Sequence, residues 1–590
     1  MILSKKKCLV LCLACIHTAL LVKNCATFSP TYDEYGHLPS GVSHWLRRDF
    51  TLYRVNPPLA RMIAALPYVV MEADNTWMAN INWGGVERQE FQAGTSLVEV
   101  YGEKSFALFF WARVACIPFS VGTLILCSFV ARHLYGPRAG LFAATFWCFS
   151  PTSLGYGSVI LPDMAAAMAG VGASFAFFLY FKTGSYSYLI YSGLALGLAL
   201  LFKSTWIILI GLWPLVILAR AAYAGADFRE IGRQAFRLAF IGGIAFTLVN
   251  AGYMFQKTGQ PLGEILFVSE TLTQRNVQST VQTAPSINCF SGTGLGNFRV
   301  PLPIDYLMGI DQQRRDFEYK TPSYLRNEWK YGGWWYYYIY AFMVKEPIGV
   351  LLLTGFASVR LLCCRQGFSW RCNFVFFLPA VALIVLVSSQ TGFNRHYRYV
   401  LPALPFGYIF LSGIANLIWN SRPGRYFVLS SLSMVILTGV SSSPYHFSYF
   451  NEFAGGFRGG PRHLLNSNLD WGQDLLPLKR WLSTQKLSEP VYLAYTLPKK
   501  FIEPLNLGVQ YRDIPKIRKV SKGKVFFDFT RLKPGTYVIF VSRLFDIDTE
   551  FEVFRELEPD LIVGTTAYVY RINEEQLDRW SLSFFEEIAN

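Results

Sequence analysis

Long apolar segments separated by short polar ones run through most of this chain. A helix needs about twenty apolar residues to cross a bilayer. Segments at or near that length cover residues 8–28, 106–130, 139–158, 164–181, 187–202, 204–220, 237–252, 347–362, 373–390, 399–418 and 426–443. The pattern therefore predicts a mainly α, polytopic membrane protein of about eleven transmembrane helices. Segments 187–202 and 204–220 are short for a full crossing.

The basic residues between these segments predict the orientation. Lysine and arginine gather in alternate loops, at residues 5–7, 132–138, 182, 220–237, 360–371 and 422–425. By the positive-inside rule these loops and the N-terminus are cytoplasmic. The large loops 29–105 and 253–333 and the chain after residue 443 are then extracytoplasmic. The formal net charge of +15 follows from these loops, so it does not indicate nucleic-acid binding. The basic N-terminus and the apolar run after it imitate a signal peptide, but we expect an uncleaved first span.

The chain after residue 443 has a mixed, less apolar composition. Residues 475–482 have the spacing of a short amphipathic helix, and residues 491–495, 537–541 and 567–572 are typical of strands. We therefore predict a transmembrane domain over 1–443, followed by a small extracytoplasmic α/β domain over 444–590. The last cysteine is Cys372, so this second domain would fold without disulfides.

Two adjacent acids, Asp33 and Glu34, stand where the first apolar segment ends. Ionisable groups near a bilayer are costly and commonly functional. Other titratable residues expected at the same membrane face are His37, Arg61, Arg113, Asp163, Lys203, Lys345, Arg395, His396 and Arg398. A carboxylate there can take a proton from a hydroxyl acceptor, and cations can hold an anionic group at headgroup depth. The pattern favours an enzyme that acts on an anionic lipid and a polar acceptor.

Each of these residues also has a structural explanation. Asp33 and Glu34 would solvate a helix end, Asp163 would be a first-turn acid of the next helix, and Lys203 would extend to the interface. His37 lies four residues after Asp33, and a structural hydrogen bond explains it better than metal binding does. Asp470 and Asp474 are explained by a turn that caps the helix near residue 475, so we leave them out of the site.

Several stretches resemble the C-type integral-membrane glycosyltransferases, in particular the bacterial relatives of protein O-mannosyltransferases and aminoarabinose transferases. They are Asp33-Glu34 with residues 55–59, Asp163 after Ser150-Pro151, and residues 197–203, 394–402, 449–452 and 467–474. The resemblance covers most of residues 1–480. One departure is Asn56-Pro57-Pro58, where many relatives have His-Pro-Pro, so a role for that histidine cannot be transferred.

The resemblance implies a hexosyl- or pentosyltransferase at the outer membrane face. It would move a sugar, with inversion, from a polyprenyl-phosphate donor to a lipid, glycan or protein acceptor. Asp33 would activate the acceptor, with Glu34 beside it and Asp163 as a second catalytic acid. Lys203, Arg395, His396 and Arg398 would bind the donor phosphate, with Lys345 as an alternative cation.

Some members of this group need a metal ion. We predict no obligatory metal for this chain, and a divalent cation stays open as a cofactor. A transporter or flippase for a lipid-linked sugar is the alternative function, but transporters commonly show internal repeats, and none is visible in the sequence. A sensor with an outer ligand-binding domain is a third hypothesis, and it would leave Asp33, Asp163 and Lys203 without a role.

Overall fold

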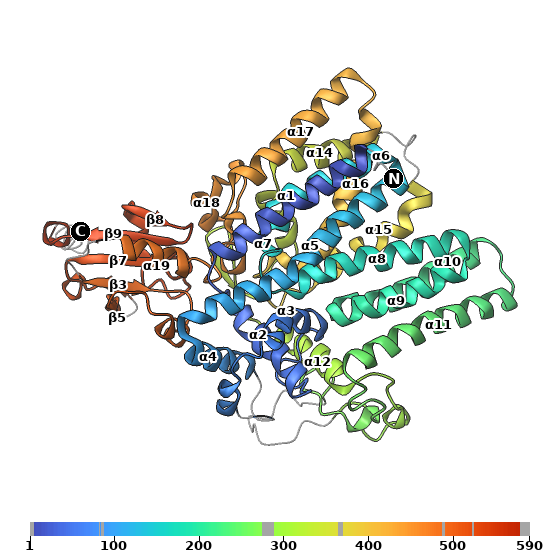
Figure 1. The fold of residues 1–590 in the computed structure, drawn as a ribbon, viewed down its shortest axis with the longest axis horizontal. Helices are drawn as coiled ribbons and strands as arrows, with labels where there is room; N and C mark the ends of the chain where they lie inside the picture. The colour runs from blue at the N-terminus through green and yellow to red at the C-terminus, as the bar shows by residue number, and fades with distance from the viewer. Residues whose placement is uncertain are drawn as a thin grey trace.

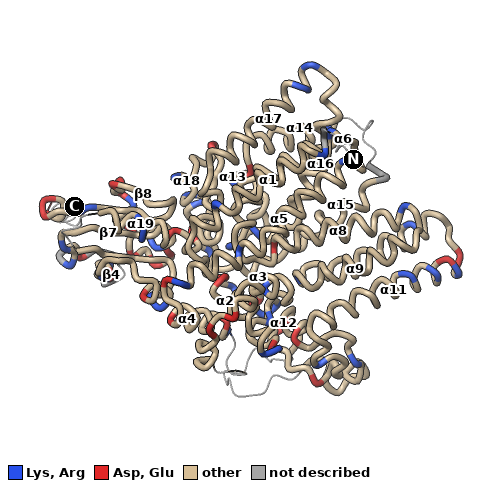
Figure 2. The backbone as a smooth tube through the Cα atoms, viewed as in Figure 1, with Lys and Arg blue, Asp and Glu red and all other residues tan. Residues whose placement is uncertain are grey.

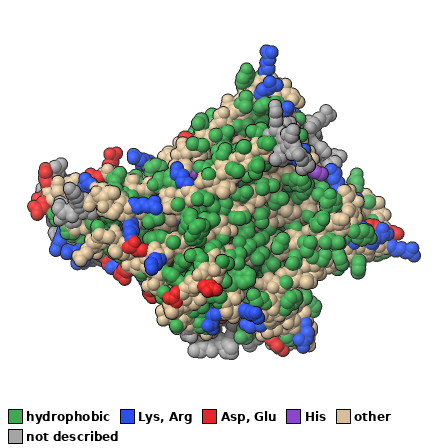
Figure 3. Space-filling view, viewed as in Figure 1, with side chains coloured by type: hydrophobic (Ala, Val, Ile, Leu, Met, Phe, Trp, Pro, Cys, Tyr) green, Lys and Arg blue, Asp and Glu red, His purple; other side chains and the backbone are tan. Residues whose placement is uncertain are grey.

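A bundle of long helices makes up most of the molecule, and a β-sheet lies at one end of it (Figure 1). The computed structural model describes residues 5–81, 83, 88–273, 288–363, 370–485, 490–521 and 524–578. Charged residues occur mainly at the helix ends, in the loops and around the sheet (Figure 2). Hydrophobic side chains cover much of the visible face of the bundle (Figure 3). Exposed hydrophobic residues of the bundle helices include Leu215, Val385 and Leu437, which are 63%, 62% and 67% exposed. Such a surface suits a lipid environment.

Every apolar segment predicted from the sequence is helical. The helices of the bundle are α1 (Lys5–Thr27), α5 (Ser105–Tyr135), α6 (Pro137–Phe149), α7 (Pro151–Tyr156), α8 (Pro162–Thr183), α9 (Tyr186–Phe202), α10 (Ile208–Tyr223), α11 (Phe228–Gly252), α14 (Ile348–Cys363), α15 (Trp370–Ser389), α16 (Leu404–Ile418) and α17 (Arg422–Ser441). Segment 139–158 is divided at Ser150, because Pro151 starts a new helix there. In the described part of the chain, seven helical stretches are long and apolar enough to cross a membrane. The total of eleven stays a prediction.

Glycines bring several helices into close contact. A methyl group at Gly193 or Gly197 of α9 would lie 2.8 Å from a side-chain carbon of Ile244 or Leu248 on α11. A methyl group at Gly170 of α8 would overlap the ring of Trp206. Small residues of this kind are what close helix packing in membranes requires. They fix the positions of α8 and α9, whose ends carry Asp163 and Lys203.

The two large loops predicted to be extracytoplasmic contain further helices. The first holds α2 (Tyr32–Leu46), α3 (Leu59–Val70) and α4 (Glu90–Tyr101), and the second holds α12 (Ile304–Glu318) and the hairpin β1 (Pro322–Leu325) with β2 (Glu328–Tyr331). A short helix, α13 (Tyr337–Lys345), leads into α14. A Cβ at Gly41 of α2 would lie 2.1 Å from the Arg61 carbonyl oxygen, and one at Gly94 of α4 would lie 2.2 Å from that of Tyr35. Helix α2, which carries Asp33, is therefore held tightly on both sides.

The sheet has five strands in the order β4-β3-β7-β9-β8. They are β3 (Val491–Ala494), β4 (Tyr511–Asp513), β7 (Gly535–Phe540), β8 (Leu561–Val563) and β9 (Ala567–Ile572). Strand β3 is parallel to β4 and β7, with Val491 opposite Tyr511 and Thr536, and β9 is antiparallel to β7 and β8. A separate hairpin joins β5 (Arg518–Ser521) and β6 (Lys524–Phe527), and the helices are α19 (Leu475–Thr484) and α20 (Val541–Leu544). The three predicted strands and the predicted helix are all present, while the boundary at residue 444 stays a prediction.

Asp470 and Asp474 are buried links rather than helix caps, which corrects the sequence interpretation. Asp474 occupies the N-cap position of α19, but its side chain makes no capping bond. Its Oδ2 accepts hydrogen bonds from the Thr565 amide at 2.7 Å and from Thr566 Oγ1 at 2.9 Å. Burial raises the pKa of Asp474 to about 6. These bonds attach the start of α19 to the turn between β8 and β9.

Candidate functional site

A cavity of about 410 Å³ collects most of the predicted site residues. Its walls come from α2, the loop after α2, α12, the start of α8, the end of α9 and residues 393–399. Six of the eight predicted side chains line it: Asp33, Asp163, Lys203, Arg395, His396 and Arg398. Since they come from four separate parts of the chain, their meeting in one cavity is a result of the fold.

Two carboxylates and two cations alternate through this cavity. Arg398 Nη2 lies 2.7 Å from Asp33 Oδ2, and Arg398 Nη1 lies 3.6 Å from Asp163 Oδ2. The other oxygen of Asp163 pairs with Lys203 Nζ. Arg398, Asp163 and Lys203 are 6%, 1% and 3% exposed. The four formal charges sum to zero, so each charged group is compensated locally even though most of the cluster is buried.

The ends of two packed helices position Asp163 and Lys203. Asp163 follows Pro162 in the first turn of α8, and Lys203 is the C-cap residue of α9 with an extended backbone. Lys203 does not extend to the interface, because its ammonium group faces Asp163 and lies 5.2 Å from the centre of the Tyr399 ring. The structural explanation proposed for Lys203 from the sequence is therefore wrong.

The segment 395–398 is fixed by residues far along the chain. Arg395 Nε donates to the Pro322 carbonyl at 2.8 Å, and Asn468 Nδ2 donates to the Arg395 carbonyl at 2.8 Å. His396 Nδ1 is hydrogen-bonded to Ser467 Oγ at 2.6 Å. Burial, together with the charges of Arg398, Arg395 and Lys203, lowers the pKa of His396 well below its usual value. The imidazole is therefore neutral near pH 7 and serves as a hydrogen-bonding group rather than as a cation.

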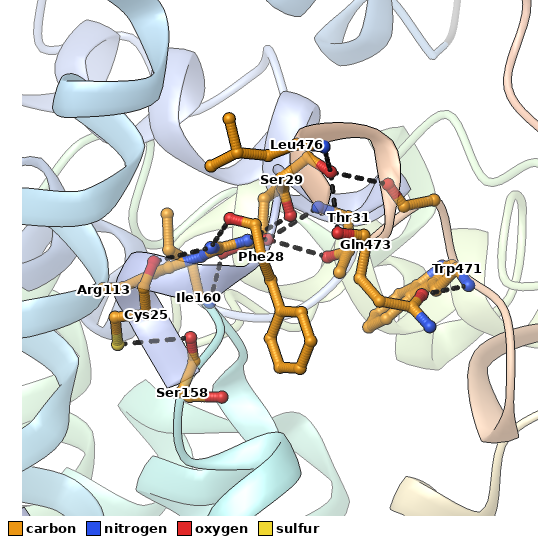
Figure 4. A network of polar contacts seen from close by, with 12 residues as sticks. Cys25, Phe28, Ser29, Thr31, Arg113, Ser158, Ile160, Trp471, Gln473 and Leu476 are labelled. Atoms are coloured by element: carbon orange, nitrogen blue, oxygen red, sulfur yellow. Dashed lines mark hydrogen bonds and ion pairs between the residues drawn. The ribbon is translucent and has the colours of Figure 1, made fainter. Parts of the chain in front are cut away.

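Glu34 faces away from Asp33 and does not line the cavity, contrary to its predicted catalytic role. Its oxygens lie 2.7 and 2.6 Å from Arg113 Nε and Nη2, and they also accept the amides of Thr31 at 2.7 Å and Ile160 at 2.9 Å. Arg113 donates further to the carbonyls of Phe28 and Ser29 (Figure 4). With all these partners, the Glu34–Arg113 pair holds the start of α2 in place.

Lys345, the predicted alternative cation, also lies outside the cavity. Its Nζ donates to the carbonyls of Asn468 at 2.7 Å and Phe447 at 3.1 Å. Burial lowers the pKa of Lys345 to about 7. Lys345 therefore attaches α13 to the residues that lead into α19.

His37 and Arg61 support the cavity from behind. The His37 ring stacks on Tyr53, with ring centres 5.0 Å apart. Arg61 Nη2 donates to the carbonyls of Val55 and Asn56 at 2.7 and 2.8 Å. Tyr53, Val55 and Asn56 all line the cavity. Asn56, which stands where many relatives have histidine, has a left-handed φ of 64°.

Several lining residues were missed by the sequence analysis, among them Arg88, Gln313, Asp316, Tyr319 and Thr321. Arg88 pairs with Asp316 and also lies 3.3 Å from Glu90. The predicted site residues are titratable residues at the ends of apolar segments, whereas these residues lie within the two large loops. A pair of opposite charges so far apart in sequence gives no local signal.

The carboxylates that were considered for a metal ion already have cationic partners. Asp33 and Asp163 contact Arg398, and Glu34 contacts Arg113. Within the described ranges, no group of three or more histidine, cysteine, aspartate or glutamate side chains is placed to hold a metal ion. The donor set that a divalent cation would need is thus not assembled by these residues.

Comparisons with known proteins agree with this architecture. The model of the dolichyl-phosphate-mannose-protein mannosyltransferase family matches residues 95–246, which include Asp163 and Lys203. No curated protein matches the chain. The Saccharomyces cerevisiae protein O-mannosyltransferase Pmt1–Pmt2 complex, bound to the sugar donor, has a TM-score of 0.52 and 14% identity, and the match covers 75% of this chain and 90% of that chain.

Two further structures match with lower TM-scores. ArnT from Cupriavidus metallidurans, bound to undecaprenyl phosphate, has a TM-score of 0.45 and 12% identity, with 95% of this chain and 97% of that chain covered. The Archaeoglobus fulgidus oligosaccharyltransferase in its apo form has a TM-score of 0.43 and 11% identity, with 85% and 64% covered. The chain has the fold of the C-type integral-membrane glycosyltransferases, which confirms the relationship predicted from its sequence at the level of that superfamily.

Proposed function

We propose that this protein transfers a sugar from a polyprenyl-phosphate donor to a lipid, glycan or protein acceptor. The observation that carries the proposal is the cluster of Asp33, Arg398, Asp163 and Lys203 in one cavity. The Nε of Arg398 is buried and has no hydrogen-bond partner among the described residues, so it is available to a ligand oxygen. The sugar donor named for the Pmt1–Pmt2 complex supports the same substrate class.

The reaction is a single displacement at the anomeric carbon. The acceptor oxygen or nitrogen attacks this carbon, and Asp33 takes the acceptor's proton. The bond between the anomeric carbon and the phosphate oxygen breaks, and the carrier phosphate leaves with the bonding electrons. Lys203, Arg395 and Arg398 stabilise the charge that grows on this phosphate, and neutral His396 donates a hydrogen bond to it. Attack opposite the leaving group inverts the anomeric configuration.

Asp163 positions the cations of the phosphate site. Its two oxygens contact Lys203 and Arg398, so it holds both side chains toward the cavity. This makes Asp163 a positioning residue, in place of the second catalytic acid that the sequence resemblance implied.

The cavity belongs on the extracytoplasmic side in this proposal. Helix α8 begins at the cavity and ends near Lys182, and α9 returns from there to Lys203. The basic loop at residue 182 and the cavity are therefore at opposite ends of the same helix pair. By the positive-inside rule, the end with the basic loop is cytoplasmic.

Sugar transfer by the purified full-length protein in nanodiscs tests the proposal. The probe is a polyprenyl phosphate that carries a radiolabelled sugar, and a membrane extract supplies acceptors. We expect label to leave the lipid carrier only when the protein is present. The flippase alternative predicts that label crosses sealed proteoliposomes while it stays on its carrier. That result, without transfer, would replace the transferase proposal.

Lys203→Ala is expected to raise the donor KM by about 10- to 100-fold, because a hydrogen bond to a charged group contributes about 1.5–3 kcal/mol. Initial rates of transfer at varied donor concentration measure this effect. Lys182→Ala, at the other end of the same helix pair, is the matched control. Thermal unfolding in detergent shows whether the variant is folded. A folded Lys203→Ala protein with unchanged KM and kcat would remove Lys203 from the phosphate site.

A further inference from the structure

A second cavity, of about 530 Å³, lies at one edge of the β-sheet. The residues that line it come after β3, at the end of β4, and from the segment that follows β7. Those that matter for its chemistry are Thr496, Lys499, Tyr511, Asp513, Lys516 and Arg543. None of them lines the cavity that contains Asp33, so the two cavities are distinct.

The topology of the sheet explains why a cavity forms there. Strands β3 and β7 are adjacent and parallel. The chain leaves β3 toward β4 on one side, and it leaves β7 toward β9 and β8 on the other side. The connections diverge at the carboxyl ends of these strands, which leaves a crevice between them. Crevices at such switch points are where open α/β sheets bind their ligands.

The side chains around the crevice suit a neutral, hydroxyl-rich ligand. Arg543 Nη2 lies 3.0 Å from Glu550 Oε2, and Lys499 Nζ lies 2.5 Å from Asp513 Oδ2. Lys516 lines the crevice as well, and Arg543 Nη1 lies 2.6 Å from Asp546 Oδ2. Three cations and three carboxylates therefore lie in or beside the crevice, and they offer donors and acceptors to hydroxyls without excess charge.

The half-buried ring of Tyr511 also lines the crevice, and the C–H face of a pyranose can pack against it. The Phe551 ring is 3% exposed and lies 5.7 Å from the guanidinium carbon of Arg543, so it supports the crevice from below.

A phosphate-bearing nucleotide fits the crevice less well. Phosphate sites at switch points use a glycine-rich turn that opens a helix directly after the strand. Here β3 is followed by Tyr495-Thr496-Leu497-Pro498, which contains no glycine. Lys499 and Arg543 are also already paired with carboxylates.

The crevice is connected to the first cavity through two consecutive residues. The Asp470 carboxylate accepts hydrogen bonds from Thr496 Oγ1 at 2.6 Å and from the Ser542 amide at 3.1 Å, so it holds both diverging connections. The ring of the next residue, Trp471, lies 4.5 Å from the guanidinium carbon of Arg398. Asp470 thus contacts the connections that form the crevice, and Trp471 contacts Arg398 in the first cavity.

We propose that this crevice is a saccharide-binding site that takes neutral sugar units of an acceptor glycan. Saccharide binding follows from the crevice itself, and only its assignment to an acceptor rests on the proposed function. The ligand class is an uncharged oligosaccharide, because the lining combines an aromatic ring with compensated charges.

Binding of neutral oligosaccharides to the full-length protein in nanodiscs tests this inference. An array of uncharged gluco-, manno- and galacto-oligosaccharides serves as the probe, and the affinity of each bound saccharide is measured by saturation-transfer NMR titration. We expect Arg543→Met and Tyr511→Ala each to weaken binding at least about tenfold, which corresponds to about 1.4 kcal/mol. Arg571→Met, an exposed arginine on β9, is the matched control and should bind as the unchanged protein does.

Two results would overturn the inference. One is that no neutral oligosaccharide binds the unchanged protein. The other is binding that persists in both folded crevice variants, which would place the saccharide elsewhere. Thermal unfolding identifies a variant that has lost its fold, and Asp513→Asn then provides a milder change in the same crevice. Because binding is measured without a donor, the absence of sugar transfer would contradict the proposed function and leave the binding result intact.

Discussion

Asp33→Asn is expected to lower the kcat of sugar transfer by about 10²- to 10⁴-fold, the usual contribution of a general base. The amide oxygen of asparagine can still accept the hydrogen bond from Arg398, so the geometry of the cluster is retained while the proton acceptor is lost. Rates of transfer at saturating donor measure kcat, and the donor KM should change much less.

Asp49→Asn is the matched control for this variant. Asp49 lies in the same loop, and its carboxylate binds the amide and hydroxyl of Thr51 rather than the cavity. We expect the control protein to transfer sugar at the unchanged rate. Full turnover by folded Asp33→Asn protein would show that another group accepts the proton, and Asp316, which lines the same cavity, would be the next residue to test.

Arg113→Met is expected to reduce stability rather than to act on chemistry. Removal of one partner from a buried ion pair commonly costs about 3–5 kcal/mol, because the other charge is left uncompensated. In this variant Glu34 would lose both contacts with Arg113, and the carbonyls of Phe28 and Ser29 would lose a donor. The midpoint of thermal unfolding in detergent should fall clearly below that of the unchanged protein.

A double-mutant cycle separates the ion pair from the packing around it. The variant that combines Arg113→Met with Glu34→Gln has no uncompensated charge, so it should lose less stability than the sum of the two single variants. Additive losses, or an unchanged midpoint in Arg113→Met, would contradict the structural role assigned to the pair.

The sequence predicted the positions of Asp33 and Glu34 but not which of the two side chains faces the cavity. The position of both acids at the end of an apolar segment was sufficient to select them. Adjacent residues of a helix point in different directions, but the sequence does not say which direction leads to the cavity. That depends on Arg113 and Arg398, which are 79 residues from Glu34 and 365 residues from Asp33. A short-range pattern holds no information on either contact.

The helices and strands were easier to predict from the sequence than the contacts of the site were. Apolar segments predicted the helices of the bundle, and runs rich in aromatic and β-branched residues predicted β3, β7 and β9. Strands β4 and β8 were missed because they are short and lie at the edges of the sheet. Arg88 and Asp316 were missed for a related reason: the residues beside them have no periodic pattern, and only the folded chain brings the two together.

The contacts of Ser29 connect the start of the chain with residues 473–476, which are synthesised much later. Its hydroxyl donates to the Gln473 carbonyl at 2.7 Å, across 444 residues, and accepts the amide of Leu476 (Figure 4). During synthesis, the contacts that support the loop carrying Asp33 can therefore form only after Leu476 has been made. A protein that ended at residue 443 would contain every residue that lines the first cavity and would still lack these contacts. Truncation before Gln473 would thus remove support from a segment near the opposite end of the sequence.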